Sequence, residues 1–507
     1  MIIQAIIIIL LAVIIYLKGV FNERYWKMRG VVFYQRNKVF GVAWDCLMKN
    51  RAYFEHFHEI YKRFPNEPAV GLGSVLKPTI FLRDLENIQH VMVTDFNAFN
   101  HKGIEVIEED VLANNLFIMN GKKWKVVRQK MNPLFTPSKL KSMFGIIDKS
   151  ARDIVPYIKN NKTNTFETLS TFCSAAKSAI VFGTTTESIF DSPFLKMAQK
   201  VSQPTFAFYL KFIVSVTMPI LIRVFKIKIF NEFEEFFVGA IKKLLQSRQN
   251  ENIKSHEFAD LCLSIKDGGL MKEDDLEVEP TDELLAAQAF FFFAAGVEPT
   301  ATGIFNTLVL LGQNPDVLKR LHEEIDNAFE ENEGSISYDL ISNMEYLDMV
   351  FSEASRFYPP IGYLMRECVK DSILPAGNIK IDKGTTVFLP IYSIHHDEIF
   401  YSDPEVFNPE RFSRENKAGI NEKAYITFGK GNRICIGMRY AILQAKAGIV
   451  QLLRHFIVKT TFEEGVKFKK DQLQVRLENV DVEFIERTDY AGLGDVSAGS
   501  NGSTVLN

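Results

Sequence analysis

The most informative run of residues lies near the carboxyl end of the chain and reads Phe428-Gly429-Lys430-Gly431-Asn432-Arg433-Ile434-Cys435-Ile436-Gly437. It places Cys435 between two glycines, just before a helix-like run from Met438 to Leu453. Gly431 and Gly437 allow tight turns and close approach of the backbone to a flat cofactor. Amide donors and the dipole of a helix start favour a thiolate. The loop therefore predicts that Cys435 is a thiolate ligand of a metal.

The neighbours of Cys435 carry this interpretation, because a cysteine taken alone is most often a small buried hydrophobic residue. Phe428 can shield one side of the sulfur from water. Arg433 carries a planar, permanently charged guanidinium that matches a carboxylate. Haem supplies both an iron and carboxylates, so the loop favours haem over an isolated metal ion.

This loop resembles the signature Phe-x-x-Gly-x-Arg-x-Cys-x-Gly of the cytochrome P450 family. Every fixed position of the signature is filled. The resemblance implies haem b with Cys435 as its axial ligand, whose sulfur pushes electron density towards the iron. It also implies a mainly α fold with small β-sheets, in which one triangular, helix-rich domain holds the haem. There the haem lies between a long oxygen-activating helix and the helix of the cysteine ligand.

Length and composition agree with one large, helix-rich catalytic domain. The chain has 507 residues, of which 47% are hydrophobic and 43 are phenylalanine, which predicts a large core with apolar pockets. Its five cysteines form an odd set without C-x-x-C spacing, which argues against a disulfide framework or a zinc site. A net charge of −3 excludes bulk attraction to nucleic acid.

The amino terminus reads as a membrane anchor, because Ile2 to Leu17 is almost entirely aliphatic and uncharged. Residues 1–20 just suffice to span a bilayer if Lys18 snorkels. A cleaved signal peptide would need a basic residue before the apolar run and small residues after it, and both are missing. Basic residues after the span keep the remainder cytosolic. The resemblance implies the endoplasmic reticulum membrane, with the catalytic domain on the cytosolic face.

We expect the catalytic domain at residues 21–489, followed by a Gly/Ser/Asn-rich tail at 490–507 that is disordered. A second apolar stretch runs from Pro204 to Phe230 and is interrupted by charges and a proline. Two interpretations stay open for it: an interfacial roof over the substrate pocket that touches lipid, or an ordinary buried helix pair.

Apolar residues recur at helical spacing through much of the chain. The predicted helices are Glu234–Arg248, Thr281–Leu311, Pro315–Glu331, Asn343–Phe357 and Met438–Phe456. The predicted strand regions are Ala69–Leu82, Ile379–Leu389 and Val466–Ile485.

Glu353 and Arg356 lie three residues apart and share one face of a helix. Most such pairs are solvated and contribute little, but here they match the family's Glu-x-x-Arg. The resemblance implies that they form a buried network with Arg411. The adjacent His395 and His396 lack a third ligand at suitable spacing, so we expect a structural role for them.

The resemblance assigns two further motifs to the haem propionates. Trp124 and Arg128 match its Trp-x-x-x-Arg, and Arg366 matches another propionate ligand, so that Arg433 would be the third compensating arginine. Lysines around Trp124 form a basic patch that could steer an acidic electron donor. The implied partner is NADPH–cytochrome P450 reductase, with cytochrome b5 as a second electron donor.

Oxygen activation is expected within Thr281–Leu311, where Ala295-Gly296-Val297-Glu298-Pro299-Thr300 resembles the family's Ala-Gly-x-Glu-Thr-Thr. Pro299 stands where the family has a threonine, and it cannot donate to the carbonyl of Ala295. We expect a helix kink at this turn. The hypothesis is that Thr300 or Glu298 orders the water that carries protons. The alternative is a kink with no catalytic hydroxyl nearby.

The resemblance places the substrate pocket in five segments with few charges: Val111–Ile118, Phe206–Phe212, Phe290–Val297, Ile361–Leu364 and Arg476–Val480. Of Phe290 to Phe293, one or two should line the pocket, because four consecutive helical residues go round the axis. Such a pocket suits an apolar molecule of small to medium size.

Three functions are compatible with these features of the sequence. The first is a membrane-bound haem-thiolate monooxygenase that uses dioxygen and NADPH to oxidise lipophilic compounds. The amino-acid sequence most resembles the microsomal insect members of the cytochrome P450 family that handle plant toxins and insecticides. The second is a reductase-independent isomerase or dehydratase on the same fold, and the third is a non-catalytic haem protein. Dependence on NADPH separates the first from the other two.

Overall fold

The computed structural model describes residues 2–48, 51–160, 164–183, 193–202, 205–250, 257–462, 465–470 and 474–487. The tail expected at 490–507 and the first residue of the Pro204–Phe230 stretch lie outside these ranges.

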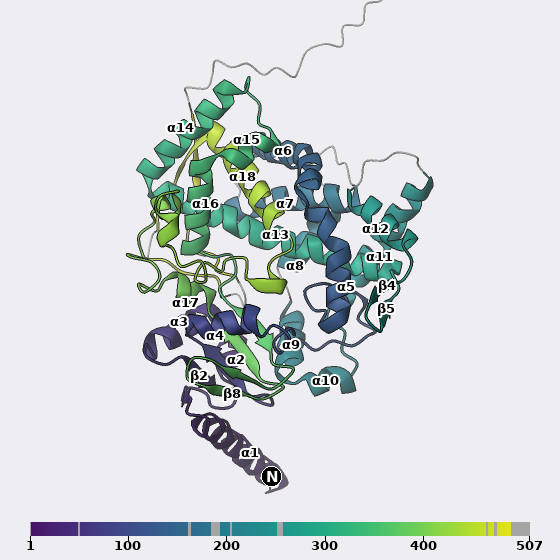
Figure 1. The fold of residues 1–507 in the computed structure, drawn as a ribbon, viewed down its shortest axis with the longest axis vertical. Helices are drawn as coiled ribbons and strands as arrows, with labels where there is room; N and C mark the ends of the chain where they lie inside the picture. Colours follow the sequence, from purple (N-terminus) through teal and green to yellow (C-terminus); the bar gives the residue numbers. More distant parts are fainter. Residues whose placement is uncertain are drawn as a thin grey trace, which may run out of the picture.

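The body is built mainly of helices (Figure 1). The longer helices, of at least ten residues, are α1 (Ile2–Lys27), α3 (Tyr53–Arg63), α5 (Gly121–Met131), α6 (Pro137–Asn160), α7 (Thr165–Phe182), α8 (Pro193–Ser202), α9 (Phe206–Thr217), α11 (Asn231–Asn250), α12 (Glu257–Asp267), α13 (Asp282–Gln313), α14 (Pro315–Glu331), α16 (Glu345–Phe357) and α18 (Met438–His455). The short helices are α2 (Val42–Leu47), α4 (Leu85–Gln89), α10 (Pro219–Val224), α15 (Tyr338–Asn343) and α17 (Ile391–His395). Single turns of π- or 3-10 helix are η1 (His90–Thr94), η2 (Val111–Ala113), η3 (Asn132–Phe135), η4 (Pro409–Phe412), η5 (Lys417–Gly419) and η6 (Gly431–Arg433).

Strands β2 and β8 lie at the end of the body near α1, whereas β4 and β5 lie beside α5 (Figure 1). The largest sheet has the order β1-β2-β3-β9-β6. Its strands are β1 (Val32–Phe33), β2 (Ala69–Leu72), β3 (Thr79–Leu82), β6 (Leu364–Glu367) and β9 (Thr386–Leu389). Three antiparallel pairs complete the strands: β4 (Met271–Glu273) with β5 (Leu276–Val278), β7 (Ser372–Leu374) with β8 (Ile379–Ile381), and β10 (Phe456–Lys459) with β11 (Glu483–Glu486).

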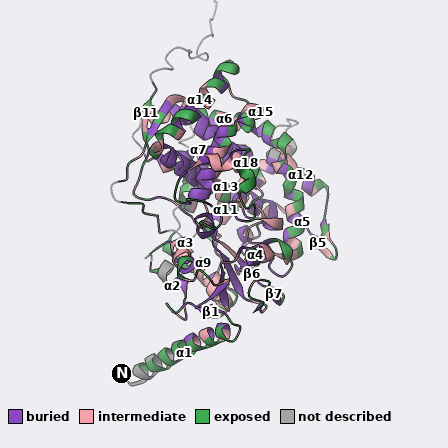
Figure 2. Ribbon diagram, turned by 60° about the vertical axis from the view of Figure 1, so that its left-hand side comes forward, coloured by how far each residue is buried: buried purple, intermediate pink, exposed green. Residues whose placement is uncertain are grey.

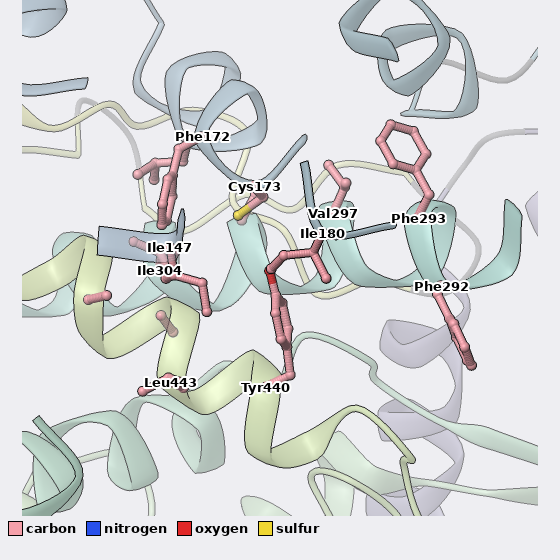
Figure 3. Packing of buried hydrophobic residues seen from close by; sticks show 14 of the residues in the cluster. Ile147, Phe172, Cys173, Ile180, Phe292, Phe293, Val297, Ile304, Tyr440 and Leu443 are labelled. Atoms are coloured by element: carbon pink, nitrogen blue, oxygen red, sulfur yellow. The ribbon is translucent and has the colours of Figure 1, made fainter. Parts of the chain in front are cut away.

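The centre of the molecule is α13, which packs against α7, α11, α16 and α18. Its side chains are buried over most of its length because apolar residues occupy all sides of it. Figure 2 shows the same centre as the most buried part of the body. Side chains of α7, α13 and α18 interdigitate there, as Phe172, Ile304 and Leu443 illustrate in Figure 3. The observed mainly helical fold with small sheets confirms the predicted fold class.

Helix α1 projects away from the body in both ribbon views (Figures 1 and 2). It extends seven residues past the expected end of the anchor and carries exposed apolar side chains, among them Ile14, Tyr16 and Leu17. Among the described residues, α13 is long and apolar enough to cross a bilayer, but 72% of its most apolar stretch is buried inside the body. Such burial identifies α13 as a core helix.

The apolar stretch beyond Pro204 forms α9 and α10, with Pro219 at the first turn of α10. Phe206, Ile220 and Val224 are exposed by 61%, 59% and 66%. Because these apolar side chains of α9 and α10 are exposed, the stretch is not an ordinary buried helix pair. They agree with an interfacial segment.

The predicted charge network is buried. Arg356 donates to both carboxylate oxygens of Glu353 at 2.7 and 2.9 Å, and both side chains are fully buried. Arg411 donates to the same carboxylate at 3.3 Å. His395 accepts from the amide of Ile426 at 3.2 Å, which ties the segment before the cysteine loop to this network. The expectation of a structural role for His395 agrees with this contact, and the described residues contain no cluster of metal-ligating side chains.

Candidate haem site

A cavity of about 500 Å³ lies between α13 and the loop that precedes α18. Its volume falls within the range of ligand pockets, about 300 to 1,000 Å³. Aromatic residues from five parts of the chain line much of it: Phe117, Trp124, Phe135, Phe208, Tyr209, Phe212, Phe230, Phe233, Phe290, Phe291, Phe292, Phe351, Phe428 and Tyr440. Cys435 lies on its wall, as do Ala295 and Thr300 of α13. The structure thus brings the cysteine loop and the oxygen-activating turn to one cavity.

The cysteine loop depends on glycine where the chain turns against another element. Gly431 has a φ of +67°, and a Cβ there would lie 2.3 Å from the carbonyl oxygen of Met92. The amide of Cys435 donates to the carbonyl of Phe428 at 2.9 Å, which closes the loop. At Gly437 a Cβ would make an ordinary contact with the Phe135 ring, whose nearest atom lies at 3.7 Å. Gly437 lines the cavity, so its missing side chain leaves room for a flat group.

Burial raises the pKa of the Cys435 thiol, although the Gly437 amide and the positive charges of Arg128, Lys177 and Lys102 act in the opposite direction. The accessible surface of this cysteine faces the cavity deep inside the molecule, so desolvation dominates over the helix start. Without a metal, burial thus outweighs the helix start, which was expected to lower the pKa of Cys435. Coordination to a metal removes the proton from a thiol outright, so a bound metal would supply the missing stabilisation.

Two of the expected propionate ligands are buried arginines with unsatisfied donors. Arg433 stacks on Trp124, with 4.2 Å from the guanidinium carbon to the ring centroid. It donates to the carbonyls of Asn100 and Met119 at 2.8 and 2.7 Å, which leaves its Nε without a partner. Arg366 is 1% exposed and its Nε also lacks a partner. Burial lowers the pKa of Arg433 to about 9 and that of Arg366 to about 10.

Arg128 lies on α5 and donates to the carbonyl of Ile434 at 2.9 Å. It thereby holds the backbone directly before Cys435. Its side chain also lines the cavity, as Trp124 does. All four predicted propionate-side residues are thus brought together, with Arg128 additionally fixing the cysteine loop.

Lys102 is a member of this cluster that sequence reasoning missed. It lines the cavity, and its ammonium lies 4.8 Å from the centroid of the Phe117 ring. Burial, with Arg366 and Arg433 as further causes, lowers its pKa well below the usual value. Lys102 stands in the segment Asn100-His101-Lys102-Gly103, outside every motif considered above. Its approach to Arg433 comes from the tertiary fold and has no signal in local spacing.

These cations provide a test of whether haem fits. No carboxylate forms an ion pair with Lys102, Arg128, Arg366 or Arg433 within the described ranges, although buried charges are ordinarily paired. Two propionates would supply the missing negative charge and accept from the free Nε groups. Gly437 and Cys435 line the same cavity, so the flat porphyrin has room beside the glycine and the iron has a sulfur ligand. The cavity therefore fits haem.

The oxygen-activating turn lies within α13, which stays helical through Pro299. Thr300 is buried and lines the cavity, so a hydroxyl is present at this turn, and its catalytic role stays a prediction. Glu298 is also buried, and one carboxylate oxygen lies 3.8 Å from Arg476. The kink at Pro299 stays a prediction.

The pocket prediction is correct for most segments and wrong for some residues. Phe290, Phe291 and Phe292 all line the cavity, one more than expected, while Phe293 is fully buried in the core. Figure 3 shows Phe292 and Phe293 pointing to opposite sides of α13. The segment Arg476–Val480 lines a separate, more polar cavity of about 330 Å³, which shares Glu298 with the first.

The basic patch expected around Trp124 is largely neutralised. Lys122 forms ion pairs with Asp275 and, at 3.4 Å, with Asp274, and Lys125 pairs with Glu273. These acids belong to the β4–β5 hairpin, which packs on α5. Lys122 and Lys125 therefore do not present the free positive charge that sequence reasoning assigned to them.

A thiol that faces a long helix across an apolar cavity, beside cations with no carboxylate partner among the described residues, is the arrangement expected of a haem-thiolate protein. The cytochrome P450 family profile matches residues 37–484. The chain is 31% identical over 465 residues to cytochrome P450 6B7 of Helicoverpa armigera, covering 89% of this chain and 91% of that one. It is 31% identical over 493 residues to cytochrome P450 9e2 of Blattella germanica, covering 90% and 92%.

Cytochrome P450 6a2 of Drosophila melanogaster shares 31% identity over 476 residues, covering 90% of this chain and 94% of that relative. The chain belongs to the cytochrome P450 family of monooxygenases. Its cofactor is haem with a cysteine thiolate ligand, and its fold is that of the family.

Proposed function

We propose that this monooxygenase is anchored in the endoplasmic reticulum membrane and oxidises lipophilic foreign compounds such as plant toxins or insecticides. The observation that carries the proposal is the cavity, which joins Cys435 and the turn at Thr300 to a wall of phenylalanines. Such a wall binds apolar molecules by burying their surface. The similarity to the insect cytochromes P450 supports the same class of substrate.

Cys435 is the proposed axial ligand of the haem iron, and Phe428 and Gly437 shape the space beside it. Arg366, Arg433, Arg128, Trp124 and Lys102 are proposed to hold the propionates through charge-assisted hydrogen bonds, packing and charge compensation. When bound, haem supplies the chemistry that inserts one atom of dioxygen into the substrate and reduces the other to water. The protein binds and orients both and keeps bulk water out.

Thr300 is proposed to hold the water that delivers protons at the oxygen-activating turn. Its hydroxyl can both donate and accept a hydrogen bond. Glu298 can pass protons inward, because it borders both the haem cavity and the polar cavity that contains Arg476 and Glu478. Pro299 leaves the carbonyl of Ala295 without the amide donor that a helix normally supplies, so this carbonyl is free to accept from water.

Electrons come from NADPH through the flavoprotein reductase that serves microsomal members of the family. Cytochrome b5 is proposed as a second donor. The ion pairs of Lys122 and Lys125 with the β4–β5 hairpin would have to open for these lysines to contact an acidic partner. Surface pairs of this kind cost little to break.

The membrane location is proposed from α1 and from the exposed apolar side chains of α9 and α10. Residues 1–20 would form the anchor and residues 21–489 the catalytic domain. We expect full-length protein expressed in yeast to stay with the microsomes after washing with sodium carbonate. A chain lacking residues 2–20 should bind more weakly and be released by the same carbonate wash, because only α9 and α10 would then touch lipid.

The test of function is to incubate the full-length protein with reductase and NADPH and a panel of terpenoids, flavonoids and pyrethroid-like compounds, with products read by mass spectrometry. We expect NADPH-dependent products that carry one oxygen atom from labelled dioxygen. Cys435→Ala should abolish them. Conversion of peroxides without NADPH or reductase would instead favour an isomerase or dehydratase, and haem binding without turnover of any compound would favour a non-catalytic role.

A further inference from the structure

Lys177 on α7 is a buried cation of the cavity that plays no part in the roles assigned so far. Its side chain is 5% exposed and lines the same cavity as Cys435. The group that most supports its charge is Cys435, with Cys173 next. Lys102 is influenced by Arg366 and Arg433 as well as by Cys435, and Arg433 by Arg366 and Arg128, whereas Lys177 influences neither Lys102 nor Arg433. Lys177 is therefore separate from the cluster that faces the propionates.

The position of Lys177 depends on Gly296 of the oxygen-activating turn. A Cβ at Gly296 would lie 2.3 Å from Cε of Lys177 and 3.0 Å from its Nζ, so another residue there would displace the lysine. On the opposite side, Nζ lies 3.3 Å from the centroid of the Tyr440 ring. Tyr440 rises from α18 towards α13 in Figure 3. The amine thus sits between the two helices that bound the haem site.

This amine has no carboxylate partner among the described residues, and its one close polar interaction is with the face of the Tyr440 ring. A tyrosine ring compensates a buried cation only in part. Burial lowers the pKa of Lys177 to about 7, while the negative charge of a Cys435 thiolate opposes that shift. A haem–thiolate centre would carry a negative counter-charge for Lys177 once its iron is reduced.

We propose that Lys177 is an electrostatic positioning residue that favours reduction of the haem iron. The inference rests on the proposed role of Cys435 as ligand. In the step concerned, one electron from the flavoprotein reductase converts ferric to ferrous iron, and no covalent bond forms or breaks. The centre gains one negative charge, which a nearby ammonium in a dry site stabilises. Charges around a ligand set tune reduction potential in this way.

The test is an optical redox titration of the full-length, haem-loaded protein and of Lys177→Met and Lys177→Gln. Methionine keeps the apolar stem and glutamine keeps a polar end, so a shift common to both variants reports the lost charge. We expect the ferrous-to-ferric ratio at a fixed applied potential to fall about tenfold, which is roughly 59 mV for a one-electron couple.

Lys446→Met is the matched control. Lys446 is a buried lysine of α18, but it pairs with Asp348 at 2.6 Å, so its removal should leave the potential nearly unchanged. An unchanged potential in both Lys177 variants, with a normal carbon monoxide spectrum, would overturn the inference while the role of Cys435 stands. An equal shift in Lys446→Met would overturn it too. A wild-type protein without the spectrum of sulfur ligation would instead overturn the role of Cys435.

Discussion

Two clusters of buried charge in this protein are organised in opposite ways. Around Glu353 the chain provides its own counter-charge, because Arg356 and Arg411 share one buried carboxylate. Around Arg433 the chain gathers cations and provides no carboxylate to any of them within the described residues. A buried carboxylate that is paired with arginines is complete within the chain, whereas buried cations without a carboxylate partner favour binding of an anionic ligand. The difference separates the structural part of the haem domain from its binding part.

Breaking the Glu353 cluster should have the largest effect. In Arg356→Leu the carboxylate of Glu353 keeps only Arg411 and the amide of Asn408, so we expect a loss of about 3 to 5 kcal/mol and little or no folded protein. Soluble yield and thermal unfolding measure this. The control is Lys141→Met, which breaks an exposed pair with Asp339 and should leave both unchanged. Normal folding of Arg356→Leu would contradict a structural role for the cluster.

The uncompensated cluster should respond differently. Lys102→Met should weaken haem binding by roughly 10- to 100-fold, the value of one charge-assisted interaction, without destabilising the haem-free protein. Haem affinity from a competition with apomyoglobin and urea unfolding of the haem-free form measure the two effects. Ile104, a buried neighbour outside the cation cluster, gives the control Ile104→Val, which should change haem affinity little. Loss of stability together with unchanged affinity would assign Lys102 to the fold.

Two threonine hydroxyls of α13 differ in a similar way. The Thr307 hydroxyl has a hydrogen-bond partner within the helix, whereas Thr300 lines the cavity. Thr300→Ala should divert electrons to peroxide, with coupling of NADPH use to product falling at least about tenfold. Thr307→Ala is the control on the same helix, because the Thr307 hydroxyl already donates to the carbonyl of Gly303 at 2.7 Å. Peroxide yield per NADPH separates the two. Unchanged coupling in Thr300→Ala would remove Thr300 from the proton path.

The smallest expected effect is on pH dependence. The pKa of Lys177 in the folded, haem-free protein is about 7, below the usual value of 10.5. The unfolded state therefore binds more protons between these values, and the stability of the haem-free protein rises with pH across that window. Urea unfolding at pH 7 and pH 10 should show a smaller rise in Lys177→Met than in the unmodified chain. An equal rise in both would mean that Lys177 is not titrating in this window.

Features decided by residues that are close in sequence could be predicted, both in the fold and in the site. In the fold, the bounds of Pro315–Glu331 match the prediction, because a proline at the first turn and a clear apolar period mark this helix. The cysteine loop was also predicted, because its glycines, Arg433 and Cys435 act within ten residues. The helical spacing of Glu353 and Arg356 places both on one face, but their buried network was predicted from the family's Glu-x-x-Arg motif.

The rest depends on elements that are distant in sequence. Lys102 and Lys177 reach the cavity from segments without a motif, and Gly431 requires glycine because of the carbonyl of Met92. Lys122 meets an acidic hairpin 153 residues away. The pKa of Cys435 follows from burial, which sequence does not specify. Local patterns therefore identify ligands, whereas the electrostatics of the site require the fold.

The most direct test of the account is the absorption spectrum of the reduced, carbon monoxide-treated protein. The account predicts the red-shifted band that thiolate ligation produces, and its loss in Cys435→Ser with haem still partly bound through the cation cluster. A colourless purified protein, or a carbon monoxide band without the shift in the unmodified chain, would contradict the assignment of Cys435 as the iron ligand.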